Sequence, residues 1–251
     1  MKKRFFQVMF YISILLGWEI LFRLHIWPDY IFPSPKAVLT TLVRGIADTS
    51  LLYAIAISMR RVLMGYSFSL IVGILLGMLL SRYRIVEDTL GSLLVGVQTL
   101  PSICWLPIAL LWFGLNEKAI IFVVIMGAVL AITIATQSGI KQINPLIIKA
   151  ARNMGAHGWR LSFEVVLPAA LPSIVTGMKQ GWSFAWRALM SAELLFVSVG
   201  LGHLLMVGRE LHDMSQVAAV MLTIVLIGWT VDAFIFSKLE RIVRRKWGLE
   251  K

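Results

Sequence analysis

Six long apolar stretches dominate this chain and restrict what it can fold into. Each is long enough to cross a lipid bilayer as an α-helix, which takes about 20 residues. They lie at 5–24, 62–80, 90–112, 119–136, 173–196 and 216–236. The sequence therefore predicts an all-α membrane protein with six transmembrane helices. We interpret residues 1–251 as one membrane domain with its core spans at about 62–236.

The composition agrees with a protein that crosses the membrane several times. Hydrophobic residues make up 59% of the chain and charged residues 15%, whereas soluble domains average about 45–50% apolar and about 25% charged residues. The net charge of +11 does not indicate nucleic-acid binding. The basic residues cluster beside the apolar spans, where they orient the protein in the membrane.

Cysteine and histidine give no sign of a metal or redox site. The single cysteine, Cys104, excludes an internal disulfide and a cysteine metal cluster. The four histidines, at 25, 157, 203 and 212, are scattered without paired spacing. We therefore expect no metal site and no cofactor in this chain.

The distribution of basic residues predicts that both termini are cytoplasmic. With six spans, the two termini share one side of the membrane. Placing 1–4, 82–88, 137–172 and 238–251 inside puts 15 Lys and Arg there, against 7 in the outer segments. Basic residues accumulate on the cytoplasmic side of membrane proteins. The segment 137–172 is then a cytoplasmic loop.

Several local features refine this topology. Residues 37–61 are predicted to form an amphipathic helix at the membrane surface, and 197–215 an external loop. Pro101 and Pro107 should bend the third span, and such breaks persist in a bilayer only where protein or water satisfies the freed backbone groups. Gly73 and Gly77, four residues apart, permit the close approach of another helix.

The fifth span, 173–196, is unusually polar. At about 100° per residue, one stripe of about 80° holds Lys179, Trp182, Trp186, Met190 and Glu193, with Arg187 at its edge. Charged groups facing lipid would cost about 2.5–3.5 kcal/mol each, so this face must point to protein or to water.

Two interpretations stay open for the ends of this stripe. In the first, Glu193 pairs with a neighbouring helix and the Lys179 side chain reaches the inner membrane surface. In the second, both residues line a translocation path. For Arg187, near the middle of the span, a water-filled path is favoured, and its charge would suit an anionic solute. Together with Gln98 of the third span, these residues form the predicted path: Lys179, Trp182, Trp186, Arg187 and Glu193.

The loop from Lys149 to Gly177 has the most distinctive pattern. It begins with small and basic residues suited to a helix, followed by a turn bracketed by Gly155 and Gly158. A short helical run, 159–166, comes next, and Pro168 and Pro172 are expected to stop it because proline cannot continue a helix interior. The pattern predicts helix, turn, helix and stop.

This loop resembles the EAA loop of binding-protein-dependent ABC importer permeases. That motif reads Glu-Ala-Ala, three residues, Gly, roughly eleven residues, then an apolar residue and Pro. The positions in register are Ala150, Ala151, Gly155, Leu167 and Pro168. Lys149 stands where the family often has Glu.

Further segments are similar to the nitrate, sulfonate and taurine branch of this family. They are Phe32-Pro33-Ser34-Pro35, Leu100 to Pro107 followed by Leu111 to Gly114, Ala192-Glu193-Leu194, Gly200-Leu201-Gly202, Asp232 and Lys246-Trp247. The likeness covers nearly the whole chain. Ala131 departs from it, at a position where many relatives carry Pro.

The resemblance implies a permease subunit with the type I ABC importer permease fold, in the bacterial inner membrane. It implies two permease copies, expected to be a homodimer, two separate ATPase subunits that bind ATP and Mg, and an external solute-binding protein. The residues expected to couple to the ATPase are Lys149, Ala150, Ala151, Gly155, Leu167 and Pro168.

The chain lacks the GxxxxGK[ST] nucleotide loop, so we expect a transport subunit and not an enzyme. The solute stays open, since nitrate, sulfonates, taurine, bicarbonate and vitamin precursors all use similar permeases.

Two other classes of protein were weighed against this interpretation. A secondary transporter would also carry polar residues inside the membrane, but the sequence shows no internal repeat of the kind typical of such folds. An intramembrane serine protease would use Ser183 with His203 or His212 as base. The glycine expected after the serine is missing, and both histidines fall in the predicted external loop.

Overall fold

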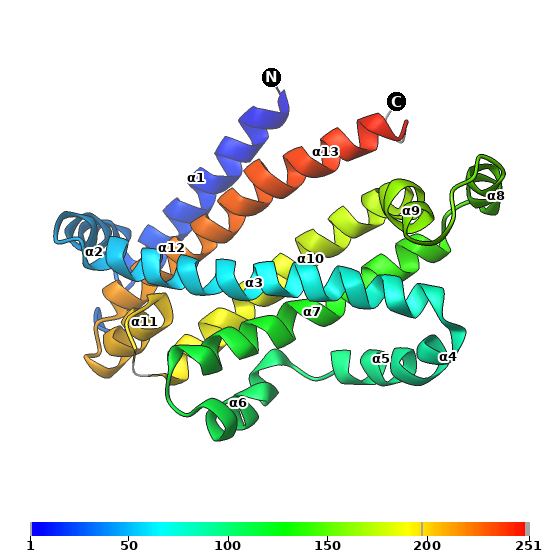
Figure 1. Ribbon diagram of the computed structural model, residues 1–251. Helices are drawn as coiled ribbons and strands as arrows, with labels where there is room; N and C mark the ends of the chain where they lie inside the picture. The colour runs from blue at the N-terminus through cyan, green and yellow to red at the C-terminus, as the bar shows by residue number, and fades with distance from the viewer. Residues whose placement is uncertain (1, 197, 249–251) are drawn as a thin grey trace. The chain divides into compact units, whose positions relative to one another are not determined.

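A computed structural model describes residues 2–196 and 198–248, and within these ranges its regular secondary structure is entirely helical. Five of the described helical stretches are long and apolar enough to cross a membrane: Phe5–Arg23, Ser50–Arg82, Glu117–Lys141, Gly158–Leu195 and Met214–Lys246. A bent pair, Arg84–Gln98 with Ser102–Phe113, makes a sixth span if its two halves cross the membrane as one. The predicted all-α class is confirmed (Figure 1).

The chain divides into two compact units. One contains Met1–Ser58 and Glu193–Leu226, and the other contains Met59–Ala192 and Ile227–Lys251. Three long helices therefore contribute residues to both units. They are α3 (Ser50–Arg82), α10 (Leu167–Leu195) and α12 (Met214–Val231).

The first unit begins with α1 (Lys2–Arg23) and α2 (Pro35–Ala47). The hydroxyl of Ser34 accepts a hydrogen bond from Ala37 N at 3.1 Å, and Pro35 occupies the first helical position. A serine cap followed by proline is a favourable helix start. The indole N–H of Trp18 on α1 donates to the Pro33 carbonyl at 3.0 Å, which ties the two helices together.

The expectation of one amphipathic helix over 37–61 is wrong. Helix α2 ends at Ala47, and α3 begins at Ser50 and continues through the second span to Arg82. The Asp48 carboxylate accepts hydrogen bonds from the hydroxyl and the backbone N–H of Ser50, at 2.6 and 3.0 Å, which caps the new helix and lowers the pKa of Asp48. Thr49, with φ of +63°, turns the chain between the two helices.

In the second unit, α7 (Glu117–Lys141) contacts both α3 and α10 through glycines. A Cβ added at Gly73 of α3 would lie 2.9 Å from Cβ of Ile132, and one at Gly77 would lie 2.5 Å from Cβ of Thr136. The predicted close approach at this glycine pair is confirmed. On its other side, α7 places Ala135 where a Cβ at Gly177 of α10 would meet it at 2.3 Å.

The predicted bend in the third span is confirmed. The chain runs through α4 (Arg84–Val86), a π-helical segment (Glu87–Gly91) and α5 (Ser92–Gln98), then unwinds at Thr99 to Pro101. A 3-10 turn (Ser102–Trp105) leads into α6 (Leu106–Phe113). The axes on either side of the break differ by 106°. Pro101 has extended backbone angles, φ −56° and ψ 139°, at the turning point.

The expected stop at Pro168 and Pro172 is wrong, since both prolines lie inside a continuous helical stretch from Gly158 to Leu195. Helix α9 (Gly158–Leu161) passes through a π-helical segment (Ser162–Val166) into α10. In that segment Leu167 N donates to Ser162 O, five residues back. The ring of Pro168 would clash with the carbonyl of Glu164, four residues back, and the wider turn there relieves that clash. Pro172 lies beyond this segment, inside α10.

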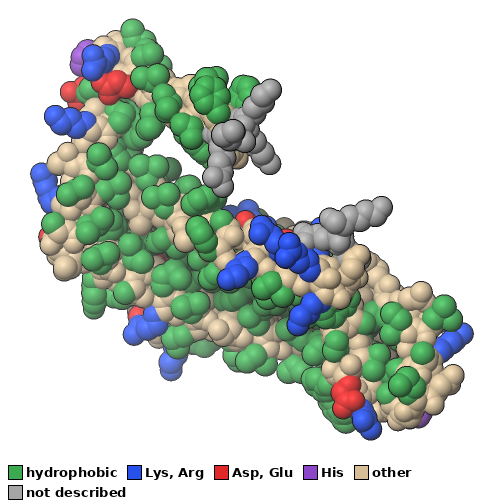
Figure 2. Space-filling model, turned by 90° about the horizontal axis from the view of Figure 1, so that it is seen from above, with side chains coloured by type: hydrophobic (Ala, Val, Ile, Leu, Met, Phe, Trp, Pro, Cys, Tyr) green, Lys and Arg blue, Asp and Glu red, His purple; other side chains and the backbone are tan. Residues whose placement is uncertain are grey.

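The predicted external loop at 197–215 contains a helix, α11 (Leu201–Glu210), although Val197 itself lies outside the described residues. After α12 the last span continues through a π-helical segment (Asp232–Phe236) into the basic α13 (Ser237–Lys246). Figure 2 shows hydrophobic side chains over much of the visible surface, with Lys and Arg in separate patches. An exposed apolar surface of this kind suits contact with lipid.

Candidate functional site

The segment that is predicted to be cytoplasmic and to contact a partner forms a well-defined helix and turn. Helix α8 (Pro145–Asn153) starts at Asn144, whose side chain accepts from Leu146 N at 3.0 Å. It ends at Asn153, and the chain turns at Gly155, which has φ of +86°, with Gly155 N donating to Arg152 O and Ala156 N to Ala151 O. This pair of bonds is the Schellman arrangement, which favours glycine at that position.

Helix α8 is anchored to the start of α10 by a small apolar core. Ile143, Ala170 and Ile174 are buried there, and Ile148 of α8 and Leu167 of α10 pack against them. The connection is therefore made through side chains as well as through the chain itself. A force applied to α8 would be transmitted directly to the base of α10.

The outer surface of this segment is unusually apolar for an exposed loop. Lys149, Ala150 and Gly155 are exposed, and Ala151 is half-buried. The same segment carries large apolar side chains that are exposed: Leu146, Ile147, Met154, Trp159 and Phe163. An exposed apolar patch rimmed by polar residues is typical of a protein contact surface.

One face of α10 is buried in the second unit. Trp182 and Trp186 are 4% and 7% exposed, and their rings stack with centroids 6.2 Å apart. Their indole N–H groups have no hydrogen-bonding partner among the described residues. Lys179 lies on the same face and forms an ion pair with Asp232 at 3.2 Å. The face that carries most of the predicted stripe therefore packs against protein.

Glu193, at the end of that stripe, is fully buried in the first unit. Its carboxylate accepts a hydrogen bond from the Ser58 hydroxyl and another from Gly202 N at 3.1 Å, and the Ser58 oxygen accepts from Leu201 N at 2.9 Å. Glu193 thus pairs with a neighbouring helix, one of the two interpretations left open. Ser58 was missed from the sequence, since an isolated serine in an apolar run carries no pattern.

Arg187 lies at the edge of this face of α10, in an exposed position. Its Nε donates to Ser183 O at 3.2 Å, and its guanidinium lies 4.9 Å from the centre of the Phe184 ring. Arg187 and Gln98 line one cavity of about 280 Å³, formed where the third span breaks. The structure therefore brings together two of the predicted path residues from helices far apart in the sequence.

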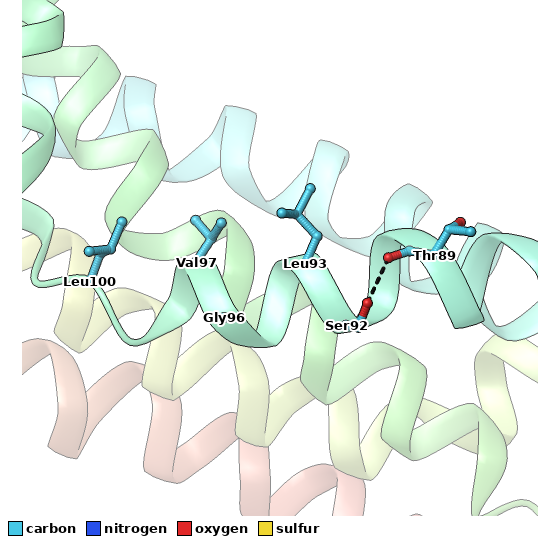
Figure 3. A pocket seen from close by; sticks show the side chains of 6 residues that line it. All are labelled: Thr89, Ser92, Leu93, Gly96, Val97 and Leu100. Atoms are coloured by element: carbon cyan, nitrogen blue, oxygen red, sulfur yellow. Dashed lines mark hydrogen bonds between the residues drawn. The ribbon is translucent and has the colours of Figure 1, made fainter.

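A second, shallower hollow of about 720 Å³ follows α5 (Figure 3). Leu93, Val97 and Leu100 line it together with the small residues Ser92 and Gly96. The Ser92 hydroxyl donates to the Thr89 carbonyl at 2.9 Å, so its polar group is satisfied within the helix. This groove is apolar and carries no charged side chain among its lining residues.

Comparisons with known proteins place these features in context. Residues 69–248 match the family model described as binding-protein-dependent transport system inner membrane component. A putative ABC transporter permease protein of Methanocaldococcus jannaschii is 38% identical over 86% of this chain and 82% of its own length. A putative aliphatic sulfonates transport permease protein of Escherichia coli is 31% identical, with 88% and 84% covered.

Two further similarities extend this comparison. A nitrate import permease protein of Synechocystis is 31% identical over 79% of this chain and 72% of its own length. Among solved structures, an inward-facing MetNI methionine ABC transporter gives a TM-score of 0.68 at 19% identity, covering 77% of this chain and 95% of that chain. At that identity the likeness concerns the fold alone.

Proposed function

Since the chain belongs to the family of binding-protein-dependent transport system inner membrane components, we propose that it is the path-forming permease subunit of an ATP-driven importer for a small anionic solute. It resides in the bacterial inner membrane as a multi-pass protein. Two copies form the path, two separate ATPase subunits bind ATP and Mg, and an external solute-binding protein delivers the solute.

The observation that carries this proposal is the attachment of α8 to α10. The small residues Ala150, Ala151 and Gly155 leave room for a partner surface, and the exposed apolar patch beside them gives it contact area. Lys149 supplies a positive charge at the edge. Leu167 and Pro168 begin the helix that receives the motion, because Leu167 packs into the core shared with α8.

The mechanism follows from this attachment. ATP binding draws the two ATPase subunits together and moves α8 with them. The shared core of Ile143, Ile148 and Ile174 transmits that movement to α10. ATP and the docked binding protein shift the balance between outward and inward access because each binds one state better than the other.

The relatives support an anionic solute. Those named for transport of aliphatic sulfonates, taurine and nitrate share 25–31% identity with this chain. Arg187 and Gln98 line the path directly in this proposal. Lys179, Trp182, Trp186 and Glu193 form the packed face that holds the path-lining side of α10 in position.

Reconstitution tests this function. The permease, its partner ATPase and the solute-binding protein are placed in liposomes, and uptake of labelled methanesulfonate, taurine and nitrate is measured. We expect uptake of at least one anion that needs hydrolysable ATP and survives an ionophore that dissipates ion gradients. Uptake that runs without ATP and collapses with the ionophore would instead identify a secondary transporter.

A further inference from the structure

The cavity at the break of the third span is lined by apolar residues together with four polar ones, Gln98, Thr99, Ser102 and Arg187. Its volume is about 280 Å³, and it lies in the second unit between the unwound residues Thr99 to Pro101, helix α7 and helix α10. Unwound backbone at membrane depth is tolerated only where protein or water meets it. The break therefore creates a place that water or a polar solute can occupy.

Arg187 lines this cavity and keeps most of its hydrogen-bond donors unused. A guanidinium has five N–H groups in a fixed fork, and the structure accounts for one of them, in the bond from Nε to the Ser183 carbonyl. Within residues 2–196 and 198–248, no carboxylate lies within ion-pairing distance of Arg187. Its charge is therefore uncompensated by any described side chain.

Two neutral donors line the same cavity. The Gln98 carboxamide and the Ser102 hydroxyl are half-buried, and neither has a side-chain hydrogen bond in the described part of the chain. Thr99 differs, because its hydroxyl donates to Gly96 O at 2.7 Å. The cavity is thus lined by three groups that can donate hydrogen bonds: the guanidinium of Arg187, the amide of Gln98 and the hydroxyl of Ser102.

We propose that this cavity is a binding site for a small, singly charged oxyanion, held by Arg187, Gln98 and Ser102. The forked guanidinium matches two oxygens of a nitrate or sulfonate group, and the amide and hydroxyl donate to the remaining oxygen. The volume lies just below the usual range of about 300–1,000 Å³ for ligand pockets, so a small ligand fits it. This proposal rests on the proposed function and adds the site at which the transported solute binds.

Thiol protection tests the site directly. Full-length permease with its ATPase is placed in lipid nanodiscs, with Cys104→Ser removing the native thiol and Thr99→Cys adding one in the cavity lining. Alkylation by a neutral, water-soluble maleimide is followed in sodium nitrate, in sodium methanesulfonate and in sodium chloride of equal ionic strength. We expect one or both oxyanions to slow alkylation and chloride to leave it unchanged, and the two arms show which oxyanion fits.

Variants of the donors sharpen the result. Hydrogen bonds to a charged group are worth about 1.5–3 kcal/mol, so Arg187→Gln should raise the anion concentration for half-protection about tenfold or more. Gln98→Leu and Ser102→Ala should raise it less. Thr176→Val is the matched control, because Thr176 is exposed on α10 and lies outside the cavity lining. It should leave protection unchanged.

The unmodified chain supplies a second control. Cys104 is exposed and does not line the cavity, so its alkylation should not respond to either anion. The site is disproved if neither anion protects, if protection survives Arg187→Gln, if Cys104 is protected equally, or if the thiol from Thr99→Cys never reacts. The assay needs no ATP and no transport, so a failure of ATP-driven uptake by the wild-type complex would be seen separately.

Discussion

The hydroxyl of Ser58 on α3 lies 2.9 and 2.7 Å from the two carboxylate oxygens of Glu193 on α10, and both side chains are fully buried. This pair holds the first turn of α11 as well, through Leu201 N and Gly202 N. A carboxylate and a hydroxyl here satisfy backbone donors that would otherwise be unpaired inside the protein.

Glu193→Ala should therefore destabilise the protein by about 1–3 kcal/mol, the cost of leaving buried donors without a partner. Glu193→Gln should cost less, because its carbonyl oxygen still accepts one hydrogen bond. Thermal unfolding in detergent measures the difference. Ser191→Ala, two residues earlier and half-buried, is the control and should change little. Equal stability of all three variants would contradict the structural role of the pair.

Gly202 tests the same contact by size. A Cβ there would lie 2.5 Å from Cβ of Glu193 and 2.9 Å from its backbone carbon. Gly202→Ala should lower the free energy of unfolding by about 1–3 kcal/mol, as overpacking does. Gly17→Ala, with no atom within 4 Å of the added Cβ, should leave stability unchanged or raise it slightly. If thermal unfolding finds Gly17→Ala more destabilising than Gly202→Ala, α11 does not pack against Glu193.

The turn after α8 should be sensitive to backbone shape. Because Gly155 has φ of +86°, Gly155→Val would be strained by about 1–2 kcal/mol. Asparagine adopts positive φ more readily. We expect Gly155→Val to lose most ATP-driven uptake and ATPase co-purification, while Gly155→Asn keeps a larger part of both. Membrane insertion, judged from the yield in membranes, should be equal. Full uptake by the valine variant would argue against α8 as the coupling element.

The ion pair between Lys179 and Asp232 provides a charge-exchange test. Lys179→Asp or Asp232→Lys alone places two like charges side by side, and an unpaired charge within a span costs about 2.5–3.5 kcal/mol. The double exchange should recover much of the lost stability, since the pair at 3.2 Å is restored with opposite polarity. Thermal unfolding of the four proteins gives the coupling energy. No recovery in the double variant would show that the two residues do not interact.

Much of the fold could be predicted because membrane spans are long and apolar. The spans and the break at Pro101 follow from composition and from the chemistry of proline. The glycine contacts of α3 follow from spacing. Where the predictions failed, short local interactions decided the outcome. The Asp48 cap separates α2 from α3, and the π-helical turn before Leu167 lets the helix run through Pro168.

The polar residues of α10 show the limit of helical periodicity. Spacing places Lys179, Trp182, Trp186 and Glu193 on one face, and the structure keeps them there, but spacing cannot say what that face meets. The answer depends on residues with no sequence signal of their own, such as Ser58 and Asp232. The coupling and path roles of these residues stay predictions, which the experiments above address.

The π-helical segment Ser162–Val166 fixes the angular phase of everything that follows it in α10. A turn closed over five residues instead of four holds one additional residue, and one residue corresponds to about 100° of rotation in an α-helix. Shortening this segment by a single residue would swing Arg187 away from Gln98 while leaving every side chain in the span chemically intact. The direction in which Arg187 points is therefore set at the end of the helix next to α8, and not within the middle of the span.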